Sequence, residues 1–301
     1  MYCTVKAFLS TQENIERYLN NVQDTYISKS GEVLKKGKLG NMKVKTNGGG
    51  ILIEGSLAKF YFNNNLETLT LPQSKEAIEK LSDSLHTDTS KANVYRVDFA
   101  TNFIVTEPPK NFYPCLIETS RMNRMPLGNS LYFKNNTRAL VFYDKNKEAI
   151  AKKMMIPEQF RNKNILRYEL RNLKYSRKKR TLKKLAEIST YNELLDEWLN
   201  GFQSIKKIQP LQINKEVQMK GLKNFQLEGL KLLIIQNFGS IDNFYQFLDS
   251  EQNKGTINRQ NKSDWKKKIE KAFNQPDLIQ PGSLLTELNQ RVKEAYELYK
   301  N

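Results

Sequence analysis

Histidine and cysteine are almost absent from this chain of 301 residues, which contains one histidine, His86, and two cysteines, Cys3 and Cys115. A zinc site of the Cys/His type needs three or four such ligands, and a disulfide scaffold needs more cysteines. The single histidine lies in a polar stretch, residues 82–88, which argues against a Ser-His-Asp or Cys-His nucleophilic centre. These absences exclude most of the familiar hydrolase classes.

Long hydrophobic runs are also lacking. No segment approaches the roughly 18 uncharged apolar residues of a membrane span, and residues 1–6 lack the apolar core of a signal peptide. We therefore expect a cytoplasmic protein that does not contact a membrane. Hydrophobic residues still make up 39% of the chain, which is enough to form a folded core.

Acidic residues are outnumbered by basic ones, 32 to 49, which gives a formal net charge of +17. The excess is densest from Lys152 to Lys184, where thirteen basic residues accompany two acidic ones. Such a segment can neutralise several phosphates, so it favours a polyanionic partner. The alternative is a solvated helix face. The candidate DNA-binding residues in this segment are Arg167, Arg171, Arg177, Lys178, Lys179 and Arg180.

The pattern of hydrophobic residues predicts an α+β fold followed by helices. Alternation predicts strands over residues 2–9, 51–58, 93–105, 131–135, 139–143 and 165–173, and helical spacing predicts a helix from Pro72 to Leu85. A helix is also expected to begin near Thr11, and the glycine-punctuated residues 31–40 are expected to form a basic turn region. We predict one mainly antiparallel sheet in a catalytic domain of residues 1–175. An all-helical domain for DNA binding or assembly follows over residues 176–301.

Two of the predicted strands carry a carboxylate flanked by arginine on the same face. Glu169 alternates with Arg167 and Arg171, and Asp98 alternates with Arg96. Two carboxylates beside cationic groups suit a hard cation such as Mg²⁺ or Mn²⁺ next to a phosphate. Internal salt bridges are the structural alternative.

A third segment adds tyrosines to this chemistry. Residues 128–138 lead into the strand of residues 139–145, so that Tyr132 and Tyr143 lie among polar and basic side chains. A tyrosine hydroxyl can attack a phosphodiester when its surroundings polarise the phosphate. The alternation of Tyr143 with Val141 and Ala139 predicts a core-facing side chain, which leaves Tyr132 as the better nucleophile.

Four segments in this order resemble the replication initiators of filamentous phages, the gene II/X family, and the related Rep-trans plasmid initiators, which share the tyrosine-nickase fold with its RRM-like sheet. The segments are residues 55–65, 95–100, 127–145 and 166–171. The resemblance implies an endonuclease that nicks one DNA strand at a replication origin and starts rolling-circle replication. It also implies strand joining, DNA as partner in single-stranded or hairpin form, and a host helicase and polymerase.

The resemblance assigns roles to individual residues. Tyr132 matches the family's nucleophile and would form a 5′-phosphotyrosyl link that frees a 3′-hydroxyl. Asp98 and Glu169 match acidic positions that would hold Mg²⁺ or Mn²⁺, with Asp144 as a helper. Phosphate contacts fall to Arg138 and Lys145, and the neighbouring Arg96 and Lys134 join the set of DNA-binding residues.

One feature departs from the wider superfamily, whose His-x-His pair binds the metal on a central strand. The corresponding segment here, residues 60–65, contains no histidine, so Asn64 is the candidate oxygen ligand. A non-catalytic origin-binding protein therefore remains an alternative. A third possibility is an RNA-binding sheet with Tyr61 and Phe62 exposed for stacking.

Overall fold

The computed structural model describes residues 1–27, 33–47, 49–209, 211–213, 222–276 and 279–300. Its contacts divide the chain into two compact units. Unit 1 comprises residues 1–208 and 284–301, and unit 2 comprises residues 209–283. Each unit is described by itself.

Unit 1 is built on a single sheet of ten strands in the order β2-β3-β4-β5-β1-β6-β11-β10-β9-β8. All neighbouring strands pair antiparallel. The predicted α+β class with an antiparallel sheet is therefore confirmed. The strands are β1 (Tyr2–Leu9), β2 (Asn20–Ile27), β3 (Val33–Leu39), β4 (Met42–Asn47), β5 (Gly50–Ser56), β6 (Asn93–Val105), β8 (Asn123–Leu127), β9 (Ser130–Lys134), β10 (Arg138–Asp144) and β11 (Asn164–Asn172).

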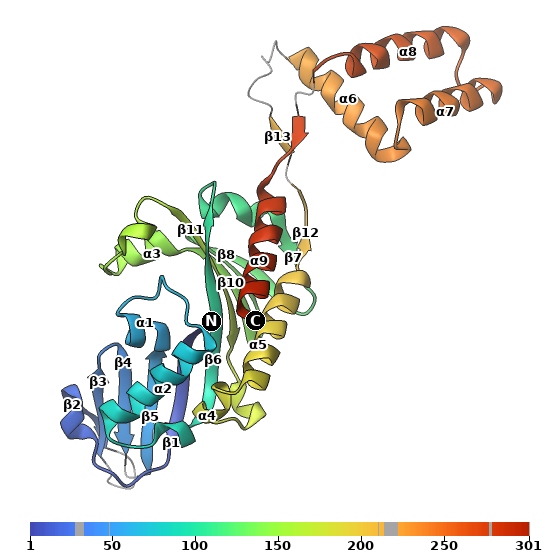
Figure 1. The fold of residues 1–301 in the computed structure, drawn as a ribbon. Helices are drawn as coiled ribbons and strands as arrows, with labels where there is room; N and C mark the ends of the chain where they lie inside the picture. The colour runs from blue at the N-terminus through green and yellow to red at the C-terminus, as the bar shows by residue number, and fades with distance from the viewer. Residues whose placement is uncertain (28–32, 48, 210, 214–221, 277–278, 301) are drawn as a thin grey trace. The chain divides into compact units, whose positions relative to one another are not determined.

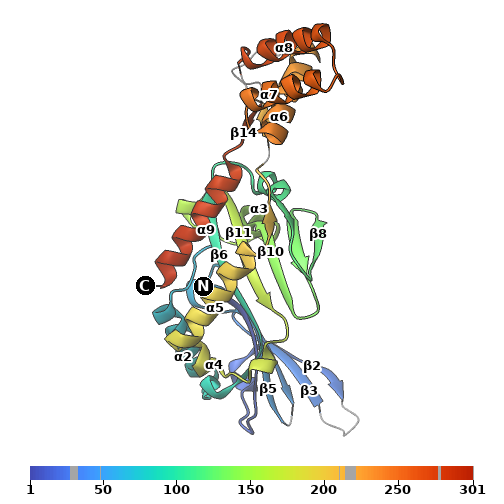
Figure 2. The ribbon, with the colours of Figure 1, turned by 90° about the vertical axis from the view of Figure 1, so that its right-hand side faces the viewer.

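Helices cover one face of this sheet (Figures 1 and 2). They are α2 (Leu71–Leu85), α5 (Ile188–Gln203) and α9 (Leu284–Lys300), with the short α4 (Leu182–Leu185) before α5. Between the helices and the sheet lies the main core, where Trp198 of α5 packs on Tyr168 and Phe103. We call this side the helix face.

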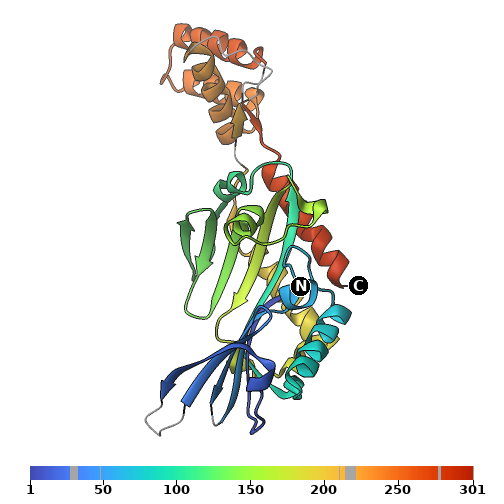
Figure 3. The same ribbon diagram turned by 90° about the vertical axis from the view of Figure 1, so that its left-hand side faces the viewer.

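We call the opposite side of the sheet, seen in Figure 3, the site face. Strand register places Tyr132 opposite Val141, Val141 opposite Glu169, and Asp98 opposite Arg171. Because directly paired residues point to the same side of a sheet, these side chains share one face. The two short helices α1 (Leu57–Phe62) and α3 (Lys145–Ala151) connect strands that carry site-face residues.

Three sequence predictions about elements were wrong. Residues 57–62 form α1 instead of the end of a strand, since Ser56 caps a helix by accepting a hydrogen bond from the Lys59 N–H. Most of residues 31–40 belongs to β3, with Gly37 inside the strand. The segment after Thr11 forms only a three-residue 3₁₀ turn, Glu16–Tyr18, before β2 begins.

Unit 2 is mainly helical. Its helices are α6 (Leu222–Phe238), α7 (Ile241–Asn253) and α8 (Arg259–Phe273), which share a small core around Ile234, Leu248 and Ile269. The short strands β13 (Leu211–Ile213) and β14 (Ile279–Pro281) pair antiparallel. None of the helices in the described part of the chain has the length and apolar character needed to cross a membrane.

The structure divides the chain differently from the predicted boundary at residue 175. Residue 175 lies inside unit 1, because α4, α5 and α9 bury their apolar sides against the sheet. The helical region is therefore split between a layer on the sheet and a separate unit inserted before α9.

Candidate active site

A pocket of about 360 Å³ opens on the site face between the sheet and α3. Its walls come from three strands and one helix. The lining residues are Asn129, Ser130, Tyr132, Tyr143, Asp144, Lys147, Glu148, Ala151, Lys152 and Arg171. The pocket therefore combines two tyrosines, carboxylates and cations in a space that could admit a phosphodiester.

Tyr132 is the half-buried tyrosine of this pocket. Its ring packs on the small apolar cluster of Ala139, Val141 and Tyr143, and the guanidinium carbon of Arg171 lies 5.8 Å from the ring centroid. Within the described residues, its hydroxyl makes no hydrogen bond. The side chain is thus held by packing while its oxygen stays available.

Tyr143, the alternative nucleophile, is held very differently. Its hydroxyl donates a 2.7 Å hydrogen bond to Oε1 of Glu169, and only 8% of the residue is exposed. Burial raises the pKa of Tyr143 well above its ordinary value, and the charge of Glu169 raises it further. These contacts disfavour the phenolate that a nucleophile needs.

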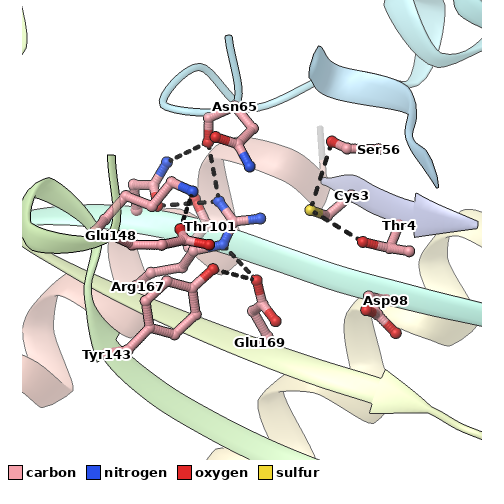
Figure 4. Close-up of polar contacts among 12 residues, drawn as sticks. Cys3, Thr4, Ser56, Asn65, Asp98, Thr101, Tyr143, Glu148, Arg167 and Glu169 are labelled. Atoms are coloured by element: carbon pink, nitrogen blue, oxygen red, sulfur yellow. Dashed lines mark hydrogen bonds and ion pairs between the residues drawn. The ribbon is translucent and has the colours of Figure 1, made fainter. Parts of the chain in front are cut away.

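Glu169 is the centre of a buried network of charged side chains (Figure 4). Nε of Arg167 donates to Oε1 at 2.6 Å, and Nε of Arg171 donates to Oε2 at 2.7 Å. Burial alone would raise the pKa of Glu169, but the guanidinium groups of Arg167 and Arg171 hold this pKa far below its usual range. Glu169 therefore stays ionised and fixes both arginines.

Asp98 lies beside this network and forms a bidentate pair with Arg96, with hydrogen bonds of 2.9 and 2.7 Å. Burial raises the pKa of Asp98 and the nearby charge of Glu169 adds to this, while Arg96 opposes the shift. Arg171 lies between the two carboxylates, with its Nε 4.0 Å from Oδ2 of Asp98 and 2.7 Å from Oε2 of Glu169.

The fit of a divalent metal ion to these two carboxylates can be judged from their hydrogen bonds. Glu169 accepts hydrogen bonds from Arg167, from Tyr143 and from Nε of Arg171, and Nη2 of Arg171 lies 2.7 Å from Oε2 in the same ion pair, so both carboxylate oxygens are engaged. In the described part of the chain, no three His, Cys, Asp or Glu side chains are grouped to hold a metal. Asp98 and Glu169 therefore do not fit a shared Mg²⁺ or Mn²⁺ ion in this arrangement.

Asn64, the third predicted ligand, has its oxygen engaged in the turn after α1. Oδ1 accepts hydrogen bonds from the N–H groups of Leu66 and Glu67, at 3.0 and 3.1 Å. The next residue, Asn65, contacts the network instead, because its backbone oxygen accepts a 3.3 Å hydrogen bond from Arg167. Its side-chain Oδ1 is buried and has no hydrogen-bond partner among the described residues.

The predicted phosphate-binding residues are divided between the two faces. Lys134 is exposed on the site face, two residues from Tyr132. Arg138 lies on the helix face, where it pairs with Glu197 of α5 at 3.0 Å. Lys145 is fully buried and pairs with Glu148 at 2.5 Å, and burial lowers its pKa to about 8.

The basic run of residues 177–180 is partly neutralised inside unit 1. Lys178 pairs with Glu193 and Glu197 of α5, and Arg180 pairs with Glu193. Arg177 and Lys179 remain exposed. The charge count of this segment therefore overstates the cationic surface that it presents.

Two aromatic residues proposed for stacking do not lie on the sheet. Tyr61 and Phe62 belong to α1, where they pack against each other and against the core. The hydroxyl of Tyr61 is hydrogen-bonded to Glu76 of α2. They do not form an RRM-like stacking platform.

Sequence reasoning missed the contribution of α3 to the pocket. Five residues from the helix and its two caps line the pocket, at spacings of three, four, seven and eight from the first, as on one helix face: Asp144, Lys147, Glu148, Ala151 and Lys152. The spacing indicates a pocket-lining face only if residues 145–151 are predicted to be helical. Asp144 could have predicted the start of this helix, because aspartate is a common N-cap residue and Asp144 accepts a hydrogen bond from the Lys147 N–H.

Comparison with known families identifies the chain. Residues 5–200 match the phage family model for the N-terminal part of the gene II replication-associated protein. The chain belongs to this family. The predicted membership in the filamentous-phage gene II replication initiator family is thus confirmed, and the match covers the whole sheet except its first residues, together with most of α5. No curated protein matches the chain.

Membership in the gene II family indicates a role as an initiator of phage DNA replication, with DNA as its partner. The matched region contains Tyr132, the pocket around it and the network of Glu169. Unit 2, which begins at residue 209, lies outside the match.

Proposed function

We propose that this gene II family member nicks one strand of origin DNA with Tyr132 as the nucleophile and later rejoins the ends. The observation that carries the proposal is the contrast between two tyrosines in one pocket. The ring of Tyr132 lies next to Arg171 and its hydroxyl has no hydrogen-bond partner in the described part of the chain, whereas Tyr143 is buried and bonded to Glu169.

The proposed step conserves atoms and charge. The Tyr132 oxygen forms a bond to the scissile phosphorus while the bond from phosphorus to the 3′ oxygen breaks. The tyrosine proton passes to solvent, and the departing 3′ oxygen takes up a proton to become a 3′-hydroxyl. The resulting 5′-phosphotyrosyl link keeps the energy of the phosphodiester, so the reverse attack by a 3′-hydroxyl restores the strand.

Cations of the pocket would stabilise the phosphate as charge builds up on its oxygens. Arg171 is held in place by Glu169, and Lys147 and Lys152 reach the pocket from α3. Arg171 in particular is largely buried and fixed by Glu169, so it needs little reorganisation to stabilise this charge. Glu169 acts in this account as a positioning residue for Arg167 and Arg171.

The requirement for Mg²⁺ or Mn²⁺ stays a prediction. Because both oxygens of Glu169 are already engaged by Arg167, Tyr143 and Arg171, no step of the proposed mechanism runs through a metal held by Asp98 and Glu169. Nicking assays with Mg²⁺, with Mn²⁺ and with EDTA measure the requirement directly.

Substitution of the two tyrosines tests the proposal. Tyr132→Phe is expected to lower the nicking rate on supercoiled origin DNA by about a thousandfold or more, since it removes the attacking oxygen. Tyr143→Phe is the matched control and should retain most of the activity, because its hydroxyl only contacts Glu169. Equal relaxation of the origin DNA by wild type and Tyr132→Phe would show that the nucleophile is wrong. If wild-type protein binds the origin without ever nicking it, the non-catalytic alternative holds.

A further inference from the structure

The site face carries a second cationic surface, far along the sheet from the pocket. Lys36 and Lys38 of β3 lie directly opposite Lys45 and Lys43 of β4. All four side chains are exposed, and none of them pairs with a carboxylate of the described residues. We call these four residues the lysine ladder.

The register of the strands places the lysine ladder on the same face as Tyr132. Lys43 is opposite Glu54, Glu54 is opposite Lys6, and Lys6 is opposite Arg96. Arg96 then joins the charged network through Asp98. Residues that lie opposite one another from β3 to β6 therefore form one row across the strands, and Glu54 is the acidic member of this row. Its basic members are Lys38, Lys43, Lys6 and Arg96.

Two like-charged pairs directly opposite each other destabilise an antiparallel sheet. Lysines are common on edge strands, where they block unwanted pairing, but β3 and β4 each have a partner on both sides. Edge protection therefore does not explain the ladder. A bound polyanion would offset the repulsion.

We propose that the lysine ladder binds the backbone of duplex DNA that flanks the cleavage position. This inference deepens the proposed function and rests on it for the position of the cleaved strand. Lysines act as point charges that follow phosphates without reading bases. A surface for single strands would add aromatic side chains for stacking, and those strand positions of β3 and β4 have none.

The spacing of the sheet sets the distance between the two surfaces. Six or seven steps between neighbouring strands separate the ladder from β9, which carries Tyr132. At roughly 4.8 Å a step, the path along the sheet is roughly 29 to 34 Å, the length of roughly ten base pairs. The bound duplex would thus lie about one helical turn from the cleaved phosphate, on one side of it.

Substrates with flanking duplexes of graded length test this arrangement. The full-length protein is titrated with oligonucleotides that carry the single-stranded cleavage sequence and about 0, 5, 10 or 15 base pairs of duplex, on either side. Wild-type affinity should rise by about thirtyfold or more when the duplex reaches about ten base pairs on one side. A gradual rise with length on both sides would overturn the inference.

The variant K36Q/K38Q/K43Q/K45Q should lose this gain. Each lost phosphate contact lowers the slope of log affinity against log salt by about 0.9, so a decrease of about 3 to 4 is expected. Cleavage of the oligonucleotide without duplex should be unchanged. The matched control K75Q/K110Q/K267Q/K293Q loses the same charge from exposed positions off the ladder and should bind the duplex like wild type.

Other outcomes overturn the inference. If the ladder variant keeps the wild-type duplex affinity and salt slope, the ladder does not contact duplex DNA. If it loses cleavage of the fully single-stranded oligonucleotide to the same degree, the ladder belongs to the path of the single strand.

The variant K36R/K38R/K43R/K45R keeps the charge and should bind the duplex like wild type, which separates lost contacts from a damaged fold. Tyr132→Phe protein, which is expected not to cleave, should still bind more tightly when the flanking duplex reaches about ten base pairs. A failure of the proposed nicking chemistry can therefore be told apart from a failure of the proposed duplex binding.

Discussion

Glu169 is the residue on which the geometry of the candidate site depends. It accepts hydrogen bonds from two arginines and one tyrosine, although burial by itself disfavours its charge. A carboxylate in this position holds cations close to a pocket from which water is partly removed. The salt-bridge interpretation of the two Arg-flanked carboxylates thus accounts for the observed contacts better than a metal site does.

Glu169→Gln is expected to destabilise unit 1 by about 3 to 5 kcal/mol, because it leaves buried guanidinium charge without its counterion. Urea denaturation measures this change. Glu54→Gln is the control on the same face, since its pair with Lys6 is well exposed and worth about 0 to 1 kcal/mol. Equal effects of the two substitutions would contradict the role assigned to Glu169.

Lys145 should make the stability of the protein depend on pH. Burial lowers its pKa from 10.5 to about 8 in the folded chain, so between these values the unfolded chain binds the extra proton. Stability therefore rises with pH across this window, by up to about 1.4 kcal/mol per pH unit. Relative to Lys145→Met, the wild type should gain stability between about pH 8 and pH 10 in urea denaturation. If the difference in the free energy of unfolding between the two proteins does not change with pH, the lowered pKa assigned to Lys145 is wrong.

At the scale of elements, the sequence predicted those strands and helices whose hydrophobic pattern is regular. The strand over residues 93–105 was predicted with the observed bounds, and the predicted start of the helix of residues 72–85 differs by one residue from the observed one. The pattern failed where local capping decided the outcome. Ser56 begins a helix within an apolar run that resembles a strand, and β3 was obscured by Gly37 and its lysines.

Helix α5 approaches the sheet so closely that one glycine is required. A Cβ at Gly201 would lie 2.9 Å from Cδ2 of Leu140 and 3.0 Å from Oη of Tyr168. We expect Gly201→Ala to destabilise unit 1 by about 1 to 3 kcal/mol through overpacking.

Gly229 of α6 provides the matched comparison, since a Cβ there would meet nothing within 4 Å. Gly229→Ala should stabilise unit 2 by about 0.5 to 1 kcal/mol, the usual gain in helix propensity. Thermal or denaturant unfolding of both variants checks the opposite signs. The packing model fails if Gly201→Ala is also stabilising.

At the scale of the whole molecule, unit 2 is an insertion between α5 and α9. The chain leaves unit 1 after residue 208 and returns at residue 284. Leu211 pairs with Pro281, so the first and last segments of unit 2 lie side by side. Replacing residues 209–283 with a short Gly-Ser linker should therefore leave unit 1 folded and cooperative in thermal unfolding. This variant should still cleave the single-stranded substrate, because the pocket belongs to unit 1. Loss of the folded sheet would show that the units depend on each other.

Sequence patterns could predict which face of a strand or helix a residue lies on, but they could not predict which side chains from distant segments pack against that face. Alternation correctly joined Asp98 and Glu169 with their arginines, yet it could not reveal that the hydroxyl of Tyr143 also donates a hydrogen bond to Glu169. Arg138 was assigned to phosphate, but its partner Glu197 comes from a helix about sixty residues later. Such long-range pairs depend on the packing of α5 on the sheet, which local patterns do not encode.

The central claim is that Tyr132 forms the covalent link to DNA. Incubating the protein with an origin oligonucleotide, digesting the product and mapping the adduct by mass spectrometry tests it most directly. We predict a 5′-phosphonucleotide attached to the peptide that contains Tyr132, with none on Tyr143. An adduct on any other residue would contradict the assignment.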